Sequence, residues 1–206
     1  MAHRCNQSFT RAIVRGMKEV IGQTGVQAIL NLAQREQVLS ARFKLDDPRG
    51  MLFKDLAALQ LILEATYGPR GGRGVALRAG RAAFGHLLRQ TAEQIGLTDM
   101  DYRLLPTPQR ILTGLQKLAA LTAASCAQSV EVVETTSTWL WRMPLCPECS
   151  HRQSTEPVCH FVVGLLQEYM AWANGGRFHH VEELECRANG GAACVFSIDR
   201  QPLELG

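Results

Sequence analysis

The chain has 206 residues, which is long enough for one sizeable hydrophobic core, so we expect one compact domain rather than two. Hydrophobic residues make up 46% of it and charged residues 20%, an ordinary globular composition. The formal net charge of +3, from 22 basic and 19 acidic residues, is too balanced to predict direct nucleic-acid binding. No apolar run approaches the ~18 residues of a membrane span, and the N-terminus lacks a secretory h-region. We therefore expect a cytoplasmic protein, whose seven cysteines are thiols or metal ligands rather than a disulfide framework.

Residues 1–125 are predicted to be helical, because apolar residues recur there at helical spacing. The pattern gives two helices within 8–39 and three more at 53–67, 75–95 and from Thr107 onward. Gly68-Pro69 ends the third helix, and the glycine- and arginine-rich residues up to Gly74 indicate a basic interhelical loop or, alternatively, a cradle for an anion. Gly80 and Gly85 interrupt the fourth helix at points where another backbone could approach.

Residues 126–206 have a different character, rich in β-branched and aromatic residues. Strands are predicted at 130–133, 135–141, 178–187 and 192–198, with a helix at 157–172 between the second and third. The fold class is therefore α+β, with N-terminal helices packed with an antiparallel β-sheet.

The last two predicted strands form a hairpin around Asn189-Gly190-Gly191. With a three-residue loop, Cys186 and Cys194 lie directly opposite each other, with Cβ atoms about 4.5–5.5 Å apart. That spacing suits two thiolates on one zinc ion, to which Cys159 would contribute from elsewhere. The alternative is three buried free cysteines, since free cysteine is among the most buried residue types.

This region resembles the 4-vinyl-reductase (V4R) domain family, most closely over 133–198. The resemblance is carried by Pro157-Val158-Cys159, Glu183-Leu184-Glu185-Cys186 and Cys194-Val195-Phe196-Ser197-Ile198. The family includes a bacteriochlorophyll-biosynthesis protein, archaeal hydrocarbon-binding proteins and the sensor domains of phenol- and toluene-responsive transcription activators. It implies the α+β fold shared by haem nitric-oxide-binding domains and transport-particle subunits.

The resemblance also implies one structural zinc ion held by Cys159, Glu183, Cys186 and Cys194. Three thiolates and a carboxylate would close a tetrahedron. From spacing alone, Glu182 or Glu185 would be equally arguable as the carboxylate ligand. Residues three apart point to opposite faces of a flat strand, so Glu183 and Cys186 can share an ion only if the strand ends or bulges between them.

Cys146-Pro147-Glu148-Cys149 is a second candidate for metal or thiol chemistry. Together with Cys159 and His160 it would make a complete four-ligand set. We favour a surface loop tightened by Pro147, because no partner C-x2-C follows at zinc-finger spacing.

Aromatic residues are concentrated between 133 and 198, as in pockets for small apolar ligands. By resemblance to the family's aromatic sensors, the ligand-binding candidates are Trp139, Trp141 and Phe161. The two tryptophans are two apart and share a strand face, so they form either a pocket wall or a core plug.

No catalytic motif is present: there is no G-x-S-x-G, H-E-x-x-H, or nicotinamide or flavin fingerprint. We therefore favour a zinc-stabilised carrier or sensor of a hydrophobic, aromatic or tetrapyrrole ligand. The alternatives are an accessory or catalytic part in chlorophyllide 4-vinyl reduction, which leaves an enzymatic role open, and a purely structural dimerisation module. We also expect a homodimer built mainly by N-terminal helices, because residues 59–63 carry apolar side chains beyond one helical stripe.

Overall fold

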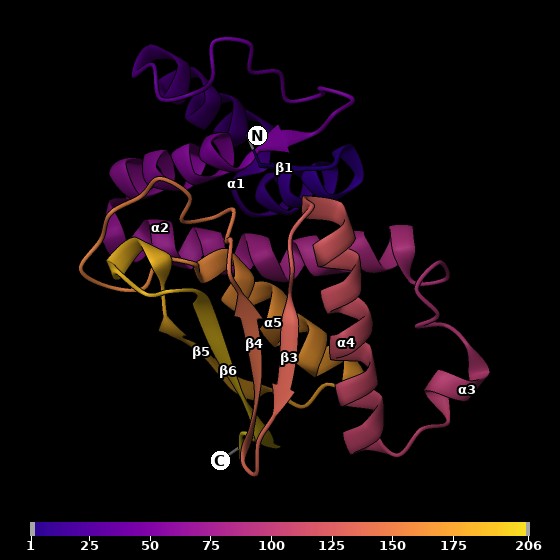
Figure 1. The fold of residues 1–206 in the computed structure, drawn as a ribbon. Coiled ribbons are helices and arrows are strands. Elements are labelled where there is room, and N and C mark those ends of the chain that lie inside the picture. The colour runs from indigo at the N-terminus through magenta and orange to yellow at the C-terminus, as the bar shows by residue number, and fades with distance from the viewer. Residues whose placement is uncertain (1–2, 205–206) are drawn as a thin grey trace.

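The computed structural model describes residues 3–204, which form a helical layer stacked on a four-stranded sheet (Figure 1). The helices are α1 (Gln7–Arg35), α2 (Phe53–Thr91), α3 (Met100–Arg103), α4 (Thr107–Cys126), α5 (His160–Ala173) and the 3-10 turn η1 (Arg187–Asn189). The strands are β1 (Arg4–Cys5), β2 (Met51–Leu52), β3 (Glu131–Glu134), β4 (Thr138–Met143), β5 (His179–Glu185) and β6 (Cys194–Pro202). Within residues 3–204, no helix is both long and apolar enough to cross a membrane.

Both long helices are kinked at a glycine in an extended left-handed conformation, Gly22 in α1 and Gly68 in α2. Each kink divides its helix into two segments, as the sequence predicted, and the break in α1 lies at Gly22. Pro69 follows the second kink directly, in the first turn of a helical segment, where a missing N–H costs nothing. Residues 69–74 are therefore helical, and the predicted basic interhelical loop is wrong.

The N-terminus is fixed by two features that the sequence analysis missed. Strands β1 and β2 pair in a small antiparallel sheet, with Cys5 opposite Met51. Cys5 is also joined by a disulfide to Cys126, the last residue of α4. The expectation that all seven cysteines are thiols or ligands is therefore wrong for these two, because the fold brings residues 121 positions apart into contact.

The larger sheet is antiparallel with the strand order β3-β4-β6-β5, which confirms the predicted α+β class. Trp141 lies opposite Phe196, and Trp139 opposite Ile198. Paired residues of neighbouring strands point to the same face, and here that face is fully buried. These side chains form one core with the helices of residues 1–125.

Helix α5 lies between the sheet and the helical layer (Figure 1), and it crosses α2 closely. A Cβ atom at Gly80 of α2 would collide with the Phe161 carbonyl, and one at Gly164 of α5 would collide with the Leu77 carbonyl. The predicted backbone approach at Gly80 is confirmed. At Gly85, by contrast, a Cβ atom would meet only the Arg89 side chain among the described residues.

Candidate metal centre and adjoining cavity

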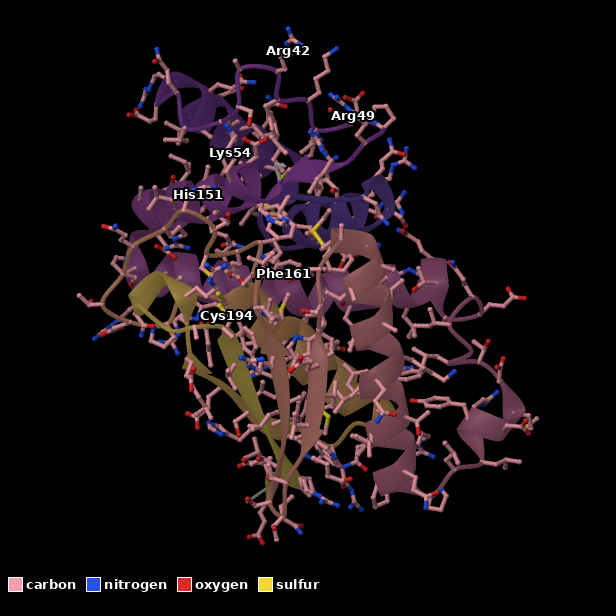
Figure 2. All side chains as sticks on the ribbon, viewed as in Figure 1. Arg42, Arg49, Lys54, His151, Phe161 and Cys194 are labelled. Carbon is pink, nitrogen blue, oxygen red and sulfur yellow. A yellow bond between two sulfur atoms is a disulfide. The ribbon has the colours of Figure 1, made fainter. Side chains whose placement is uncertain are left out.

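Five free cysteines converge at one end of the sheet, and we call them the cysteine cluster: Cys146, Cys149, Cys159, Cys186 and Cys194. Cys159 is the N-cap of α5, and Cys194 is the first residue of β6. Cys186 directly follows β5, while Cys146 and Cys149 lie in the loop after β4. All five are buried, and Figure 2 shows sulfur atoms gathered beside Cys194.

The ligand atoms form two groups of four, in each of which all atoms lie within 4.8 Å of one another. One group is Cys159, Glu183, Cys186 and Cys194, the set that the family resemblance implied. The other is Cys146, Cys149, Cys159 and Cys194. Cys159 and Cys194 belong to both.

The distances between sulfur atoms match those around a tetrahedral ion. Zinc–sulfur bonds of about 2.3 Å place two thiolates on one ion about 3.8 Å apart. The Sγ atom of Cys159 lies 3.8 Å from those of both Cys186 and Cys194, which are 4.0 Å from each other. The Sγ atoms of Cys146 and Cys159 are 3.5 Å apart, and those of Cys149 and Cys194 are 3.4 Å apart.

Glu183 contributes a carboxylate oxygen that lacks a partner. Its Oε2 atom accepts a hydrogen bond from the Cys159 backbone N–H at 2.8 Å, whereas Oε1 is buried and has no hydrogen-bond partner within residues 3–204. Burial raises the pKa of this carboxyl, and hydrogen bonds from Cys159 oppose the shift. A cation between Oε1 and the thiols would supply the missing partner.

A bulge brings Glu183 and Cys186 to the same side of β5. The register with β6 shifts between Glu183 and Glu185, and the strand ends at Glu185. This is the irregularity that the ligand set required. The predicted three-residue hairpin loop is wrong, however, because residues 186–193 connect the strands and include η1 and Gly190, with φ of 96°.

The Cys146–Cys149 loop is part of the cluster, so the predicted surface loop is wrong. The two residues are 2% and 3% exposed. Glu148 anchors the loop, because its carboxylate accepts the backbone N–H groups of Phe161 and Val162 at 2.8 and 3.2 Å, in the first turn of α5. Its four-ligand group contains Cys194 in place of the suggested His160.

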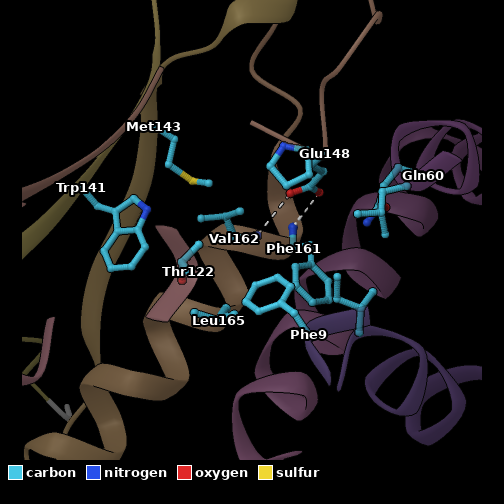
Figure 3. A pocket seen from close by; sticks show the side chains of 12 residues that line it. Phe9, Gln60, Thr122, Trp141, Met143, Glu148, Phe161, Val162 and Leu165 are labelled. Carbon is cyan, nitrogen blue, oxygen red and sulfur yellow. Dashed lines mark hydrogen bonds between the residues drawn. The ribbon is translucent and has the colours of Figure 1, made fainter. Parts of the chain in front are cut away.

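An apolar cavity of about 40 Å³ adjoins this loop. Figure 3 shows Trp141 and Met143 on one side of it, Gln60 on the other and Glu148 between them. The cavity is lined by Phe9, Ile13, Leu56, Gln60, Thr122, Trp141, Met143, Pro147, Glu148, Phe161, Val162 and Leu165. It is thus bounded by α1, α2, α4, α5 and β4, and by the loop that carries Cys146 and Cys149.

Of the three ligand-binding candidates, Trp141 and Phe161 line this cavity and Trp139 does not. Trp139 is buried beneath Arg200, whose guanidinium lies 5.2 Å from the centre of the indole ring. Both Trp139 and Trp141 have a buried indole N–H without a partner within residues 3–204, but only that of Trp141 belongs to a residue that lines the cavity.

The polar lining residues were missed. Gln60 and Thr122 lie on helices far from the aromatic segment in sequence, and no local pattern marks them. Glu148 was visible within the C-x2-C segment, but its role depends on the position of α5. Burial raises the pKa of Glu148 well above its usual range, against the opposing effect of its two N–H donors.

Comparison with solved structures identifies the fold. An Fe(II) unliganded H-NOX protein mutant from K. algicida superimposes with a TM-score of 0.58 at 11% identity, covering 95% of this chain and 96% of that one. The Fe(II)NO form of an H-NOX protein from S. oneidensis gives a TM-score of 0.57 at 11% identity, covering 94% of this chain and 98% of that one. No curated protein matches the chain. At such low identity the likeness establishes the fold alone.

Another structure with this fold was solved in work on haem redox potential, but the cavity of this chain does not fit haem. Pockets for larger ligands have volumes of about 300–1,000 Å³, well above the 40 Å³ found here. Among the described residues, no histidine lines the cavity to ligate an iron.

A family model matches the segment that carries the cluster. Residues 139–200 match the V4R domain, which confirms the resemblance found in the sequence. The match includes all five clustered cysteines and Glu183, together with Trp139, Trp141 and Phe161. Residues 139–200 of the chain thus resemble the V4R domain, within an H-NOX-like α+β fold.

Proposed function

We propose that this protein is a zinc-stabilised, small-molecule-binding protein, acting in the cytoplasm as a carrier or sensor of a hydrophobic or aromatic ligand. The observation that carries the proposal is the apolar cavity in which the Trp141 indole N–H is buried without a partner within residues 3–204. The V4R match and the H-NOX-like fold support a binding role.

The zinc ion of this proposal is held by Cys159, Glu183, Cys186 and Cys194. Soft thiolates at tetrahedral spacing favour zinc over hard cations, which prefer oxygen ligands. Four protein ligands leave no open position for water, so this zinc ion is structural rather than catalytic. It would hold the start of α5 against the end of β5 and the start of β6.

The ligand side of the proposal rests on the polar atoms of an otherwise apolar cavity. A buried indole N–H usually has a hydrogen-bond partner. A phenolic hydroxyl in the cavity could accept from Trp141 Nε1 and donate to the Glu148 carboxylate, since both residues line it. A benzene-sized cavity is about 150 Å³, so binding requires lining side chains to move apart. Flexible Met143 is suited to such repacking.

Cavity size favours a small aromatic molecule over a tetrapyrrole. Phenol and toluene are therefore the probes for titration calorimetry, because they have similar size and differ in their polar atom. We expect phenol to bind more tightly than toluene to the zinc-loaded protein, since only phenol can satisfy the Trp141 N–H.

Trp141→Phe keeps an aromatic ring and removes the N–H, so it should weaken phenol binding about ten-fold, equivalent to ~1.4 kcal/mol, and leave toluene binding unchanged. Trp139→Phe is the matched control on the same strand, outside the cavity, and should bind phenol like the wild type. Equal phenol binding by wild type and Trp141→Phe would count against this site.

A homodimer formed through the N-terminal helices is the last part of the proposal. Leu61 and Tyr67 on α2 are 46% and 43% exposed, large apolar side chains that a second copy would cover. Light scattering at micromolar concentration should give a dimeric mass, and Leu61→Glu should shift it to a monomeric mass. A monomeric mass for the wild type would contradict the homodimer and leave the proposed zinc and ligand sites unaffected.

A further inference from the structure

The four zinc ligands named in the proposed function leave two buried thiols of the cysteine cluster without a role. Cys146 and Cys149 are not among its four ligands, yet they approach Cys159 and Cys194 as closely as those ligands approach one another. With Cys159 and Cys194 they form a complete group of four sulfur atoms within 4.8 Å. All four are buried.

These two thiols are held in place by the surrounding structure. Glu148, between them, is anchored to the first turn of α5 by two backbone hydrogen bonds. The Arg152 N–H donates to the Cys149 carbonyl at 3.0 Å, which closes the loop on its other side. Arg152 in turn reaches Glu64 of α2 with an Nη2–Oε2 distance of 2.6 Å. The loop thus presents both sulfurs to Cys159 and Cys194 through contacts with two helices.

We propose that the cluster binds a second zinc ion through Cys146, Cys149, Cys159 and Cys194, with Cys159 and Cys194 bridging the two ions. The six side chains of the two groups can complete two tetrahedra only if these two thiolates are shared. The geometry meets this condition, because the shared pair lies 3.8 Å apart and each member approaches ligands of both groups.

Charge and access also suit a second ion. Two divalent ions do not neutralise five thiolates and a carboxylate, so the cluster keeps a net negative charge. Arg152 has a buried Nη1 atom without a partner within residues 3–204. It lines a surface pocket of about 340 Å³ together with Arg187, Cys146 and Cys149. The second ion would face this pocket, because Cys146 and Cys149 line it and none of the four ligands of the first ion does.

The first test is the number of zinc ions per chain, measured by native mass spectrometry and elemental analysis of the whole protein after zinc loading and removal of excess metal. We expect two ions. A single ion at saturating zinc would overturn the proposal, whatever the behaviour of the variants.

Variants assign the ions, and their outcomes separate this proposal from the zinc site on which the proposed function rests. Cys146→Ser/Cys149→Ser should retain one ion, and Cys186→Ser should also retain one. Cys5→Ser/Cys126→Ser removes the same number of cysteines outside the cluster and should retain two.

One ion in both the wild type and Cys146→Ser/Cys149→Ser would overturn the second site and leave the first intact. One ion in the wild type and none in that double variant would replace both sites by a single four-cysteine site.

Cobalt(II) substitution of the wild type needs no variant and therefore avoids any failure to fold. Bridging thiolates couple the unpaired electrons of two cobalt ions. We expect the electron paramagnetic resonance signal to rise with the first equivalent and to fall as the second binds. A signal that grows in proportion through two equivalents would show two separate ions and overturn the shared-ligand geometry.

Discussion

The two halves of this protein use cysteine in opposite ways. Among the N-terminal helices, Cys5 before α1 and Cys126 at the end of α4 meet as an isolated pair and are joined by a disulfide. In the C-terminal half, five cysteines meet with a carboxylate and remain unbonded, with sulfur–sulfur distances that fit a metal centre. A thiol's chemistry therefore depends on how many ligand atoms the fold brings to it: one partner allows a cross-link, and three or more create a site for an ion.

The halves should consequently respond to different reagents. A chelator acts on the cysteine cluster and a mild reductant acts on the disulfide, while both halves share one hydrophobic core. The following predictions use this difference, beginning with the largest expected effect.

Removal of metal should be the most damaging change. Structural zinc contributes about 10–16 kcal/mol of apparent binding free energy in zinc-finger peptides, which is comparable to the ~5–15 kcal/mol stability of a whole domain. Chelation should therefore abolish the cooperative thermal unfolding transition measured by circular dichroism, and added zinc should restore it. An unchanged melting temperature after full chelation, checked by elemental analysis, would contradict a structural role.

Breaking the disulfide should cost less and leave the metal bound. Cross-links that close loops of about 100 residues contribute roughly 4–5 kcal/mol by restricting the unfolded chain, and this one spans 121 positions. Urea unfolding of zinc-loaded Cys5→Ser/Cys126→Ser should show this loss of stability with the zinc content of the wild type. Loss of zinc in this variant would show that metal binding by the cysteine cluster depends on the disulfide.

The crossing of α2 and α5 offers a smaller and more local test. Gly80→Ala should destabilise the protein by about 1–3 kcal/mol, because the new methyl group collides with the Phe161 carbonyl of α5. Gly85→Ala, on the same helix and without such a neighbour among the described residues, should instead stabilise it by up to about 1 kcal/mol. Chemical denaturation gives the free energy of unfolding of both variants. Equal changes in the two variants would contradict the close crossing of α2 and α5.

Acid and alkali should distinguish the cluster from the helical core. Metal-bound thiols must be deprotonated, so acidification should release zinc and destabilise the fold. Burial instead raises the pKa of Tyr169, whose hydroxyl donates to the Ile111 carbonyl of α4 at 2.7 Å. A tyrosine with a raised folded-state pKa contributes stability below its unfolded value of about 10, and this contribution is lost as pH rises through the folded value.

Tyr169→Phe should therefore lower stability at neutral pH by about 1 kcal/mol and reduce the loss of stability above pH ~10. Unfolding free energies measured across the alkaline range check this expectation. The variant should keep the acid response of the wild type, since the cluster is unchanged; an altered zinc release in acid would contradict this separation.

Local sequence determined much of the fold. Helical periodicity, Gly68-Pro69 and the β-branched segments placed most elements near their observed positions, because these features act over a few neighbouring residues. Given the ligand set implied by the resemblance, strand geometry also required β5 to end or bulge between Glu183 and Cys186, and the structure has both features there. The short V4R segments were enough to indicate the domain at residues 139–200.

Tertiary structure decided which side chains meet. The Cys5–Cys126 disulfide, the inclusion of Cys146 and Cys149 in the cluster and the polar lining of the cavity all join residues from separate elements. Trp139 and Trp141 have the same residue type and strand face, but only Trp141 reaches the cavity. Spacing along the chain fixes a side chain's direction within its own element, whereas its neighbours depend on how the elements pack, and that packing is set by contacts distributed over the whole core.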